Sequence, residues 1–370
     1  MNNIINKIKK IYNIKFRFDL PKPKKILQFD ELNSHLLKKA IRKDFNILPR
    51  HVPELYFWIF LKQIVFFDFR FITYFKNYIK FTSPKIVINQ IDNDLSFYTF
   101  KNNFKGIYFI AIQNGARLSY SPMFKKKFSN NFKNLNCDHI FLFNKYLIKE
   151  YKKIIKSKYH VLGNFTNNMV SISKTKYKNT FLFISQYKKY KNNRPHDFFI
   201  NQLLKLLNLY FLNHKRKINI LLRSKNTSYQ KDEINFYKKF FKSNCIFHKS
   251  TSWAASYRIV DKFENIIFMD SCLGYEAISR KKKVAILYSM KNKKKLIKYI
   301  SWPSKKSRKG HNFFITNRLN YKEINRVLQN IYNCSQINWE KKYYTNFKDL
   351  MFINKDNTKL NHIIDNILNN

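Results

Sequence analysis

The segment from Asn265 to Ser289 constrains the fold more than any other part of the chain. It contains two unbroken apolar runs of strand length, Ile266–Met269 and Val284–Leu287, separated by residues 270–283. Continuous apolar strands are typical of parallel sheets whose two faces are both covered. The residues between the runs fit one short helix, so the segment predicts strand, turn, helix and strand of an α/β domain.

The turn of this segment predicts an anion site. Asp270 and Ser271 precede a helix that we expect to begin near Cys272, and they can cap it. Backbone N–H groups and the macrodipole at a helix N-terminus attract phosphate. Gly274 would permit close approach, and Glu276 could accept hydrogen bonds from ribose hydroxyls. The alternative is an ordinary capped helix that carries an exposed Glu.

Apolar runs and helical patterns alternate along the rest of the chain, which predicts doubly wound parallel sheets in two Rossmann-like domains. We expect strands at 25–29, 85–91, 107–112, 139–143, 159–162, 180–185, 218–222 and 245–248, and helices at 31–43, 95–103, 145–156, 196–213, 232–241 and 252–262. The expected organisation is a basic N-terminal arm (1–20), an N-terminal domain (21–163), a linker (164–179), a C-terminal domain (180–334) and a helical tail (335–370).

A polar cluster follows the expected strand at 85–91. It consists of Asp92, Asn93 and Asp94. Ligands of doubly wound sheets bind at the carboxyl ends of strands. In a group transfer, Asp92 or Asp94 could deprotonate the hydroxyl of the substrate that accepts the group, and Asn93 could bind this acceptor. The alternative is that these residues only cap the next helix.

A second cluster follows the strand at 107–112. Gln113 and Asn114 could orient the acceptor or bind sugar hydroxyls, and Gln113 is grouped with the two aspartates as a catalytic candidate. Gly115 would allow the turn, and Arg117 could hold an anion.

Two strand ends of the C-terminal domain carry groups suited to a diphosphate. Ser185 and Gln186 could donate hydrogen bonds, and Arg223 could offset negative charge. Lys225 could serve with Arg223 or be a solvated lysine.

The sequence at 270–277, Asp-Ser-Cys-Leu-Gly-Tyr-Glu-Ala, resembles the donor-binding segment of GT-B glycosyltransferases, which have two facing Rossmann-like domains. It is similar, more narrowly, to bacterial surface carbohydrate biosynthesis proteins, which are related to polysaccharide and glycerophosphate polymer transferases. The Asp-Asn and Gln-Asn-Gly turns and the segment Gly310–Asn317 resemble the same family. Related sequences often carry Thr where Cys272 stands. The resemblance implies donor binding by the C-terminal domain, acceptor binding by the N-terminal domain, and a C-terminal helix that crosses back to the first domain.

Composition excludes several other classes. Four separated cysteines and nine histidines form no metal-ligand pattern, and five glycines leave no dinucleotide or Walker loop. No apolar run is long enough to span a bilayer, and Leu55–Phe67, interrupted by Lys62, is interpreted as core. The net charge of +50 reflects a Lys-rich composition typical of A/T-rich codons and favours anionic partners without indicating specific nucleic-acid binding.

These observations predict a bacterial, metal-independent glycosyltransferase that needs no cofactor. It would transfer a sugar or polyol phosphate from an activated nucleotide to a glycan or lipid-linked precursor of O-antigen or capsule. The expected location is cytoplasmic, with peripheral contact at the inner face of the plasma membrane as an option. The alternatives are a non-catalytic GT-B-like assembly protein and a basic nucleic-acid-binding protein.

Overall fold

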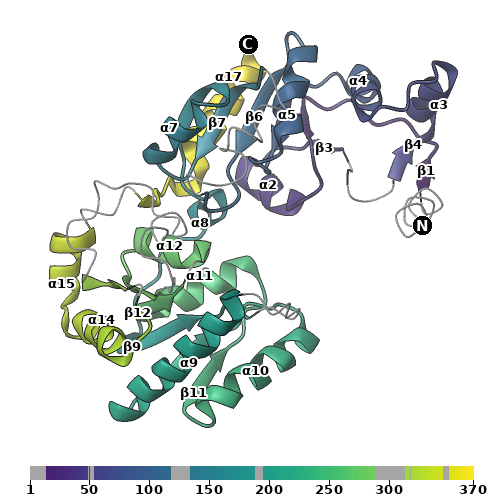
Figure 1. Ribbon diagram of the computed structural model, residues 1–370. Helices are drawn as coiled ribbons and strands as arrows, with labels where there is room; N and C mark the ends of the chain where they lie inside the picture. The colour runs from purple at the N-terminus through teal and green to yellow at the C-terminus, as the bar shows by residue number, and fades with distance from the viewer. Residues whose placement is uncertain are drawn as a thin grey trace. The chain divides into compact units, whose positions relative to one another are not determined.

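The computed structural model divides the chain into two compact units, each with a six-stranded sheet (Figure 1). The described residues are 14–48, 50, 54–117, 134–187, 195–269, 271–287, 313–316, 318–344 and 350–370. The first unit comprises Met1–Asn114, Ser121–Leu162 and Asp356–Asn370, and the second comprises Gly115–Tyr120 and Gly163–Lys355.

The first unit is built on a parallel sheet with the strand order β3-β2-β5-β6-β7-β8. Its strands are β2 (Ile26–Gln28), β3 (Asn46–Ile47), β5 (Ile86–Asn89), β6 (Tyr108–Ile112), β7 (Asn136–Leu142) and β8 (Lys156–Val161). Its connecting helices are α2 (Ser34–Ile41), α5 (Leu95–Phe100), the 3-10 turns η1 (Lys101–Asn103) and η3 (Lys145–Leu147), and α7 (Ile148–Tyr151). The strand order reverses between β2 and β5, so a topological switch point lies at the carboxyl ends of these two strands.

Aromatic rings fill the core of the first unit. Phe29, which follows β2, packs against Phe75 and Phe97 with ring centroids 5.0 Å and 5.2 Å apart. All three rings are fully buried. Large rings at close edge-to-face contact contribute much of the apolar burial that holds the helices onto the sheet.

The second unit has the strand order β11-β10-β9-β12-β13-β14, again with parallel neighbours. Its strands are β9 (Tyr177–Ile184), β10 (Ile218–Leu221), β11 (Cys245–His248), β12 (Phe263–Phe268), β13 (Lys283–Leu287) and β14 (Ile315–Thr316). Its helices are α8 (Phe165–Asn168), α9 (Pro195–Asn213), α10 (Thr227–Phe241), α11 (Trp253–Lys262), α12 (Cys272–Ser279), α14 (Tyr321–Asn333) and α15 (Gln336–Asn338), followed by the π-helical turn η6 (Trp339–Tyr344).

The helices of the second unit form two groups. Helix α9 contacts α10 and α14, whereas α11 contacts α8 and α12. Numbered from β9, the strand order is 3-2-1-4-5-6, the Rossmann order, and its switch point lies between β9 and β12. The predicted fold class, two GT-B-like Rossmann sheets of parallel strands, is therefore confirmed.

The C-terminal helix α17 (Thr358–Asn369), which follows the 3-10 turn η8 (Lys355–Asn357), belongs to the first unit. The Asn361 side chain donates a 3.1 Å hydrogen bond to the carbonyl of Ala40 in α2. Lys43 also forms a 2.7 Å ion pair with Asp365. The last helix thus returns to the domain in which the chain begins, as the crossover helix was expected to do.

Three segments differ from the sequence predictions. The segment expected as a linker contains α8, whose Phe165 and Asn167 are buried, and β9 already begins at Tyr177. The helix expected at 145–156 is shorter, because η3 and α7 end before β8 starts at Lys156. The tail after residue 335 contributes to both units.

An insertion between β3 and β5 was not predicted. Strand β4 (Glu54–Tyr56) pairs in parallel with β1 (Lys15–Arg17), and helices α3 (Phe57–Val65) and α4 (Phe71–Thr82) follow it. The interpretation of Leu55–Phe67 as core was wrong for much of its length. Tyr56, Ile59 and Gln63 are buried, but Trp58 and the residues from Ile64 to Phe67 are exposed.

Candidate donor site

The carboxyl ends of β9 and β10 lie side by side in the second unit. Ile184 is in register with Leu221, and the N–H of Ser185 donates a 3.1 Å hydrogen bond to the Leu221 carbonyl. Ser185 and Gln186 leave β9 at the same edge where Arg223 leaves β10. The Ser185 and Gln186 side chains are buried, whereas Arg223 is exposed.

A buried glutamate on α10 organises both strand ends. Glu233 accepts hydrogen bonds from the N–H groups of Arg223 and Ser224, at 2.9 Å and 3.1 Å, and from the Ser185 hydroxyl. One turn later, the Tyr237 hydroxyl donates to Ser185 Oγ at 2.9 Å. These contacts fix the course of the backbone just after β9 and just after β10.

The N-terminus of α12 completes this edge of the sheet. Ser271 occupies the N-cap position but makes no side-chain cap bond, and its carbonyl accepts from the N–H groups of Gly274 and Tyr275. Asp270, predicted to share the capping, lies outside the described residues. A β-carbon on Gly274 would come within 2.2 Å of the Phe268 ring. Glycine is therefore needed here for packing of α12 on β12.

These parts surround one pocket of about 380 Å³. Its lining includes five of the predicted donor-binding residues: Ser185, Gln186, Arg223, Ser271 and Cys272. The pocket opens at the carboxyl ends of β9, β10 and β12, beside the switch point, where open α/β sheets bind ligands. Its volume lies within the range of small-molecule sites.

Glu276 does not line this pocket. Its carboxylate is buried and accepts a 2.5 Å hydrogen bond from the Asn164 amide. Burial raises the pKa of Glu276, while hydrogen bonds from Tyr257 and Asn164 act in the opposite direction. Tyr257 in turn contacts the Thr166 hydroxyl at 3.0 Å. Glu276 thus connects α12 with the start of α8 and with α11.

The predicted catalytic residues lie at the carboxyl ends of β5 and β6. Asp92 is fully buried, and its carboxylate accepts hydrogen bonds from the Tyr151 hydroxyl and, at 3.1 Å, from the Asn114 N–H. Gln113 is also buried and accepts a 2.8 Å hydrogen bond from the Phe143 N–H. Asp92 and Gln113 therefore hold the turn that follows β6 and join the ends of β6 and β7.

The remaining residues of this first-unit cluster are more accessible. Asp94 caps α5 by accepting from the Ser96 N–H at 3.2 Å, and it pairs with Arg50. Helix capping, the alternative role for this aspartate, is thus observed. Asn93 is exposed and Asn114 is half-buried.

The turn after Asn114 belongs to the second unit. The Ala116 N–H contacts Cys272 Sγ at 3.1 Å, so the residues from Gly115 to Arg117 lie beside the start of α12. Gly115 has no positive φ, and an added β-carbon would meet only the Arg117 side chain, at 3.5 Å. Its expected role in permitting the turn is not required by this geometry.

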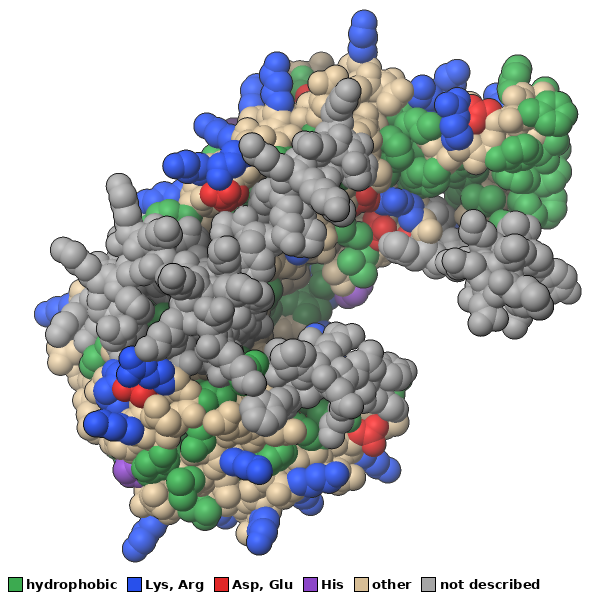
Figure 2. All heavy atoms as spheres, in the orientation of Figure 1, with side chains coloured by type: hydrophobic (Ala, Val, Ile, Leu, Met, Phe, Trp, Pro, Cys, Tyr) green, Lys and Arg blue, Asp and Glu red, His purple; other side chains and the backbone are tan. Residues whose placement is uncertain are grey.

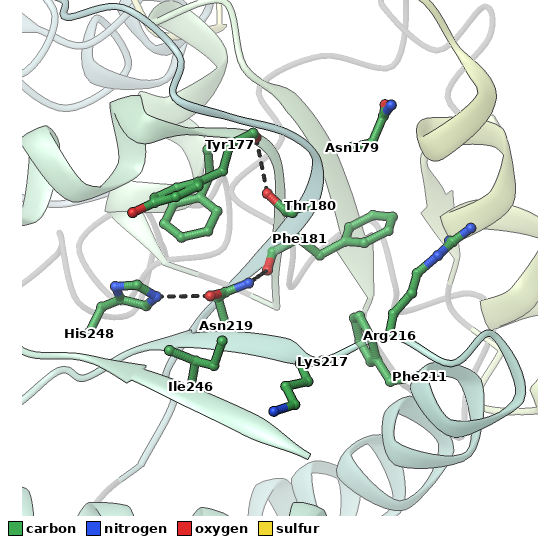
Figure 3. Close-up of a pocket in the computed structure, with 11 residues that line it drawn as sticks. Tyr177, Asn179, Thr180, Phe181, Phe211, Arg216, Lys217, Asn219, Ile246 and His248 are labelled. Atoms are coloured by element: carbon green, nitrogen blue, oxygen red, sulfur yellow. Dashed lines mark hydrogen bonds between the residues drawn. The ribbon is translucent and has the colours of Figure 1, made fainter. Parts of the chain in front are cut away.

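A second cavity, of about 370 Å³, lies toward the opposite end of β9 and β10. Figure 3 shows Asn219 at its centre, with its amide between the His248 ring and the Phe181 carbonyl. Its wall also includes Tyr177 and Phe263. It contains none of the predicted site residues.

Sequence reasoning missed Glu233 and Tyr237, which hold the strand ends at the pocket. It also missed Asn164 and Tyr257, which hold the buried Glu276. Glu233 and Tyr237 are four residues apart on α10 and share its buried face. A polar pair on the apolar face of a helix was the available signal.

Two six-stranded parallel sheets, with a pocket at the Rossmann switch point of the second, define a GT-B-like α/β protein. Residues 110–368 match a family model described as "putative O-antigen biosynthesis protein". The match spans well over half of the chain, and the chain belongs to this O-antigen biosynthesis family. The predicted relation to surface carbohydrate biosynthesis proteins is confirmed. No curated protein matches the sequence.

Solved structures show the same architecture at low identity. A glycosyltransferase from Rickettsia africae is 10% identical, with a TM-score of 0.55 over 95% of this chain and 100% of that chain. The UDP-GlcNAc 2-epimerase from Methanocaldococcus jannaschii, solved with UDP-GlcNAc and UDP, is 11% identical, with a TM-score of 0.54 over 92% and 99%. S. aureus MnaA, solved with UDP, is 14% identical, with a TM-score of 0.53 over 93% and 96%. These likenesses establish the fold.

Neither a membrane span nor a metal cluster is found in the part of the chain that the structure describes. No described helix is both long and apolar enough to cross a bilayer. Within the same ranges, no three His, Cys, Asp or Glu side chains are grouped to hold a metal ion.

Proposed function

We propose that this protein is a glycosyltransferase that moves a sugar, or a related polyol phosphate, from an activated nucleotide to a precursor of a bacterial surface glycan such as O-antigen or capsule. The observation that carries the proposal is the pocket at the switch point of the second sheet, which brings together Ser185, Arg223, Ser271 and Cys272. Membership of the O-antigen biosynthesis family supports the pathway.

The pocket offers complementary chemistry for a nucleoside diphosphate. The N-terminus of α12, at Ser271 and Cys272, lines the pocket. The helix dipole and the backbone N–H groups of the first turn favour negative charge there. Arg223 adds a cation, and Ser185 and Gln186 add short polar groups. The predicted contact of Glu276 with the ribose would require its buried carboxylate to leave the Asn164 amide when the nucleotide binds.

Fixed donors and a cation can stabilise a departing nucleoside diphosphate by electrostatic preorganisation. We assign this task to Arg223 and the N-terminus of α12, so the transfer would need neither a metal nor another cofactor. Activity that survives exhaustive treatment with a chelator would support this part of the proposal.

The acceptor is assigned to the first unit and the turn after β6. Asp92, Asp94 and Gln113 are the proposed catalytic residues, and Asn93, Asn114, Gly115 and Arg117 the proposed acceptor contacts. Asp92 already holds the backbone of Asn114. A change at Asp92 should therefore alter both the position of the turn and any proton transfer from the acceptor hydroxyl.

The proposed partners are a nucleotide-sugar and a glycan or lipid-linked glycan, with no specific nucleic acid. A lipid-linked acceptor would bring this protein to the inner face of the plasma membrane as a peripheral protein. A non-catalytic assembly role is the second candidate, because buried contacts of Asp92 and Gln113 also suit a purely structural turn.

The test is incubation of the purified protein with UDP-, GDP- and CDP-activated sugars and with lipid extract from the native cells, followed by mass spectrometry. Transfer yields free nucleotide together with a glycan or lipid product that gains the sugar mass. Conversion of the nucleotide-sugar into an isomer would indicate an epimerase instead. If a donor binds but every donor remains chemically unchanged, the assembly role is favoured.

A further inference from the structure

The insertion between β3 and β5 places large apolar side chains on the surface. Phe67 is 85% exposed, Phe66 76% and Val65 64%. Phe69 and the neighbouring Phe18 are also mostly exposed. Figure 2 shows hydrophobic side chains gathered over the region that Figure 1 labels α3, β4 and β1. Contiguous exposed apolar surface of this kind marks an interaction site.

Ring contacts make these side chains one surface. Phe18 packs against Phe57 of α3 at 5.0 Å, and Phe60 of α3 packs against Phe69 at 6.2 Å between ring centroids. Trp58 donates from its indole N–H to the Phe18 carbonyl at 2.7 Å. The segment before α3 and the turn after it are therefore held to the same helix.

The turn after α3 has its polar groups inside and its apolar groups outside. The Gln63 amide is buried and donates to the carbonyls of Asp68 and Arg70 at 2.8 Å and 3.0 Å. The Asp68 N–H donates back to the Gln63 carbonyl at 3.0 Å. Phe67, between them, has a φ of +48°, which bulky residues rarely adopt. A built turn, rather than a loose loop, presents these rings to solvent.

The same turn neutralises its own carboxylate. Asp68 accepts hydrogen bonds from Arg70 Nε at 2.8 Å and from the Thr73 hydroxyl at 2.7 Å. The Arg70 guanidinium holds the pKa of Asp68 well below its usual range, with a further contribution from Thr73. The carboxylate beside the exposed rings is thus already paired with a cation.

The surroundings are basic. Lys62 shares one face of α3 with Trp58 and Val65, because these residues recur at intervals of three and four. Residues 14–20 and 54–82 carry six basic side chains against three carboxylates. Aromatic rings flanked by lysines are typical of surfaces at a membrane interface, where the lysines attract anionic headgroups. A second copy of a chain with a net charge of +50 would be repelled instead.

We propose that the surface formed by Phe18, Trp58, Val65, Phe66, Phe67 and Phe69, the insertion surface, docks onto an anionic lipid bilayer. The rings enter the boundary between headgroups and acyl chains, and Lys62 lies near the headgroup phosphates. Helix α3 has nine residues, which is too short to span the bilayer. This inference deepens the peripheral membrane contact proposed above, but it does not depend on transferase activity.

The experiment is flotation of the full chain with vesicles of phosphatidylethanolamine and phosphatidylglycerol, and with vesicles of phosphatidylcholine alone. We expect binding to the anionic vesicles, weakened by salt. The Phe66→Ser/Phe67→Ser variant should bind them about tenfold more weakly for each ring removed. Brominated lipid should quench the fluorescence of the wild type more than that of Trp58→Phe.

Leu212→Ser is the matched control, because Leu212 is an exposed apolar residue of α9 in the other unit. It should bind vesicles like the wild type. Circular dichroism should show all variants folded, since exposed side chains are removed.

Equal flotation of wild type and the double variant would overturn the proposal, as would no flotation of the wild type. A wild-type dimer that becomes monomeric in the double variant without a change in flotation would show a self-association surface instead. Nucleotide binding by the double variant should be unchanged, which separates this test from that of the donor site.

Discussion

The carboxylate of Glu233 accepts a 2.9 Å hydrogen bond from the backbone N–H of Arg223. One residue of α10, fully buried, thereby sets the course of the chain as it leaves β10 and enters the proposed donor site. The same carboxylate accepts from the Ser185 hydroxyl at the end of β9. The position of the Arg223 cation is thus linked to that of the neighbouring strand end.

We therefore expect Glu233→Gln to weaken both folding and nucleotide binding. In this variant the side-chain NH₂ group replaces one carboxylate oxygen, so a backbone N–H that donates to Glu233 in the wild type loses its acceptor. The expected cost is about 1–3 kcal/mol in the free energy of unfolding. Urea unfolding measures this cost, and calorimetry measures the nucleotide affinity. Lys231→Gln, an exposed change on the same helix, is the control and should stay within about 0.5 kcal/mol of the wild type. Equal behaviour of the two variants would contradict the positioning role.

Arg280 and Asp261 form an ion pair whose side chains are both inaccessible to solvent, with Nε and Oδ1 2.7 Å apart. Arg280→Met should lower the free energy of unfolding by about 3–5 kcal/mol, because the carboxylate remains buried without its cation. Lys281→Met breaks an exposed pair with Glu340 and should cost about 1 kcal/mol or less. Chemical denaturation compares them, and a similar small loss for both would refute the prediction.

Stability should depend on pH through Glu276. Its folded-state pKa is raised by burial, so the folded protein binds this proton more tightly than the unfolded chain does. The resulting stabilisation is complete below the unfolded pKa of about 4.3 and is lost as the pH rises through the folded pKa. Glu276→Gln should therefore match the wild type in acid and exceed its stability at neutral pH. Unfolding curves across this pH range provide the measurement, and a difference that does not change with pH would argue against it.

Asp92 should matter for both structure and turnover. Asp92→Asn replaces one of the two carboxylate oxygens with an NH₂ group, so either the Tyr151 hydroxyl or the Asn114 N–H loses its acceptor. This should lower the free energy of unfolding by about 1–3 kcal/mol. If Asp92 also takes the acceptor proton, kcat should fall while donor affinity is retained. Lys105→Ala changes an exposed side chain of the same unit and should leave stability within about 0.5 kcal/mol of the wild type. Full turnover by Asp92→Asn would remove it from the proposed catalytic residues.

The parallel sheets could be predicted because their strands are unbroken apolar runs. Residues 266–269 and 284–287 are buried in the structure, as expected for strands covered on both faces. Strand ends can be read from the sequence as well. Ser185, Arg223 and Ser271 were selected because they lie at or just after the ends of such runs, and the structure brings them to one pocket.

Burial of polar side chains could not be predicted, because it depends on partners distant in sequence. Asn164 appeared to belong to a solvated linker, yet its amide meets Glu276, 112 residues later. The reverse holds for Phe66 and Phe67, which have the composition of core and lie on the surface. Local composition does not reveal which neighbour, if any, will cover a side chain.

The most direct test of the donor site is calorimetric titration of the purified protein with UDP, GDP, CDP, CMP and their sugar conjugates. Arg223→Gln and Lys225→Gln should be titrated in parallel. Arg223 lines the pocket and Lys225, two residues later, does not, although both are exposed cations. The account predicts that one nucleotide class binds and that Arg223→Gln weakens it by about tenfold or more, while Lys225→Gln has little effect. Equal losses in the two variants, or no binding by any nucleotide, would contradict the assignment of this pocket.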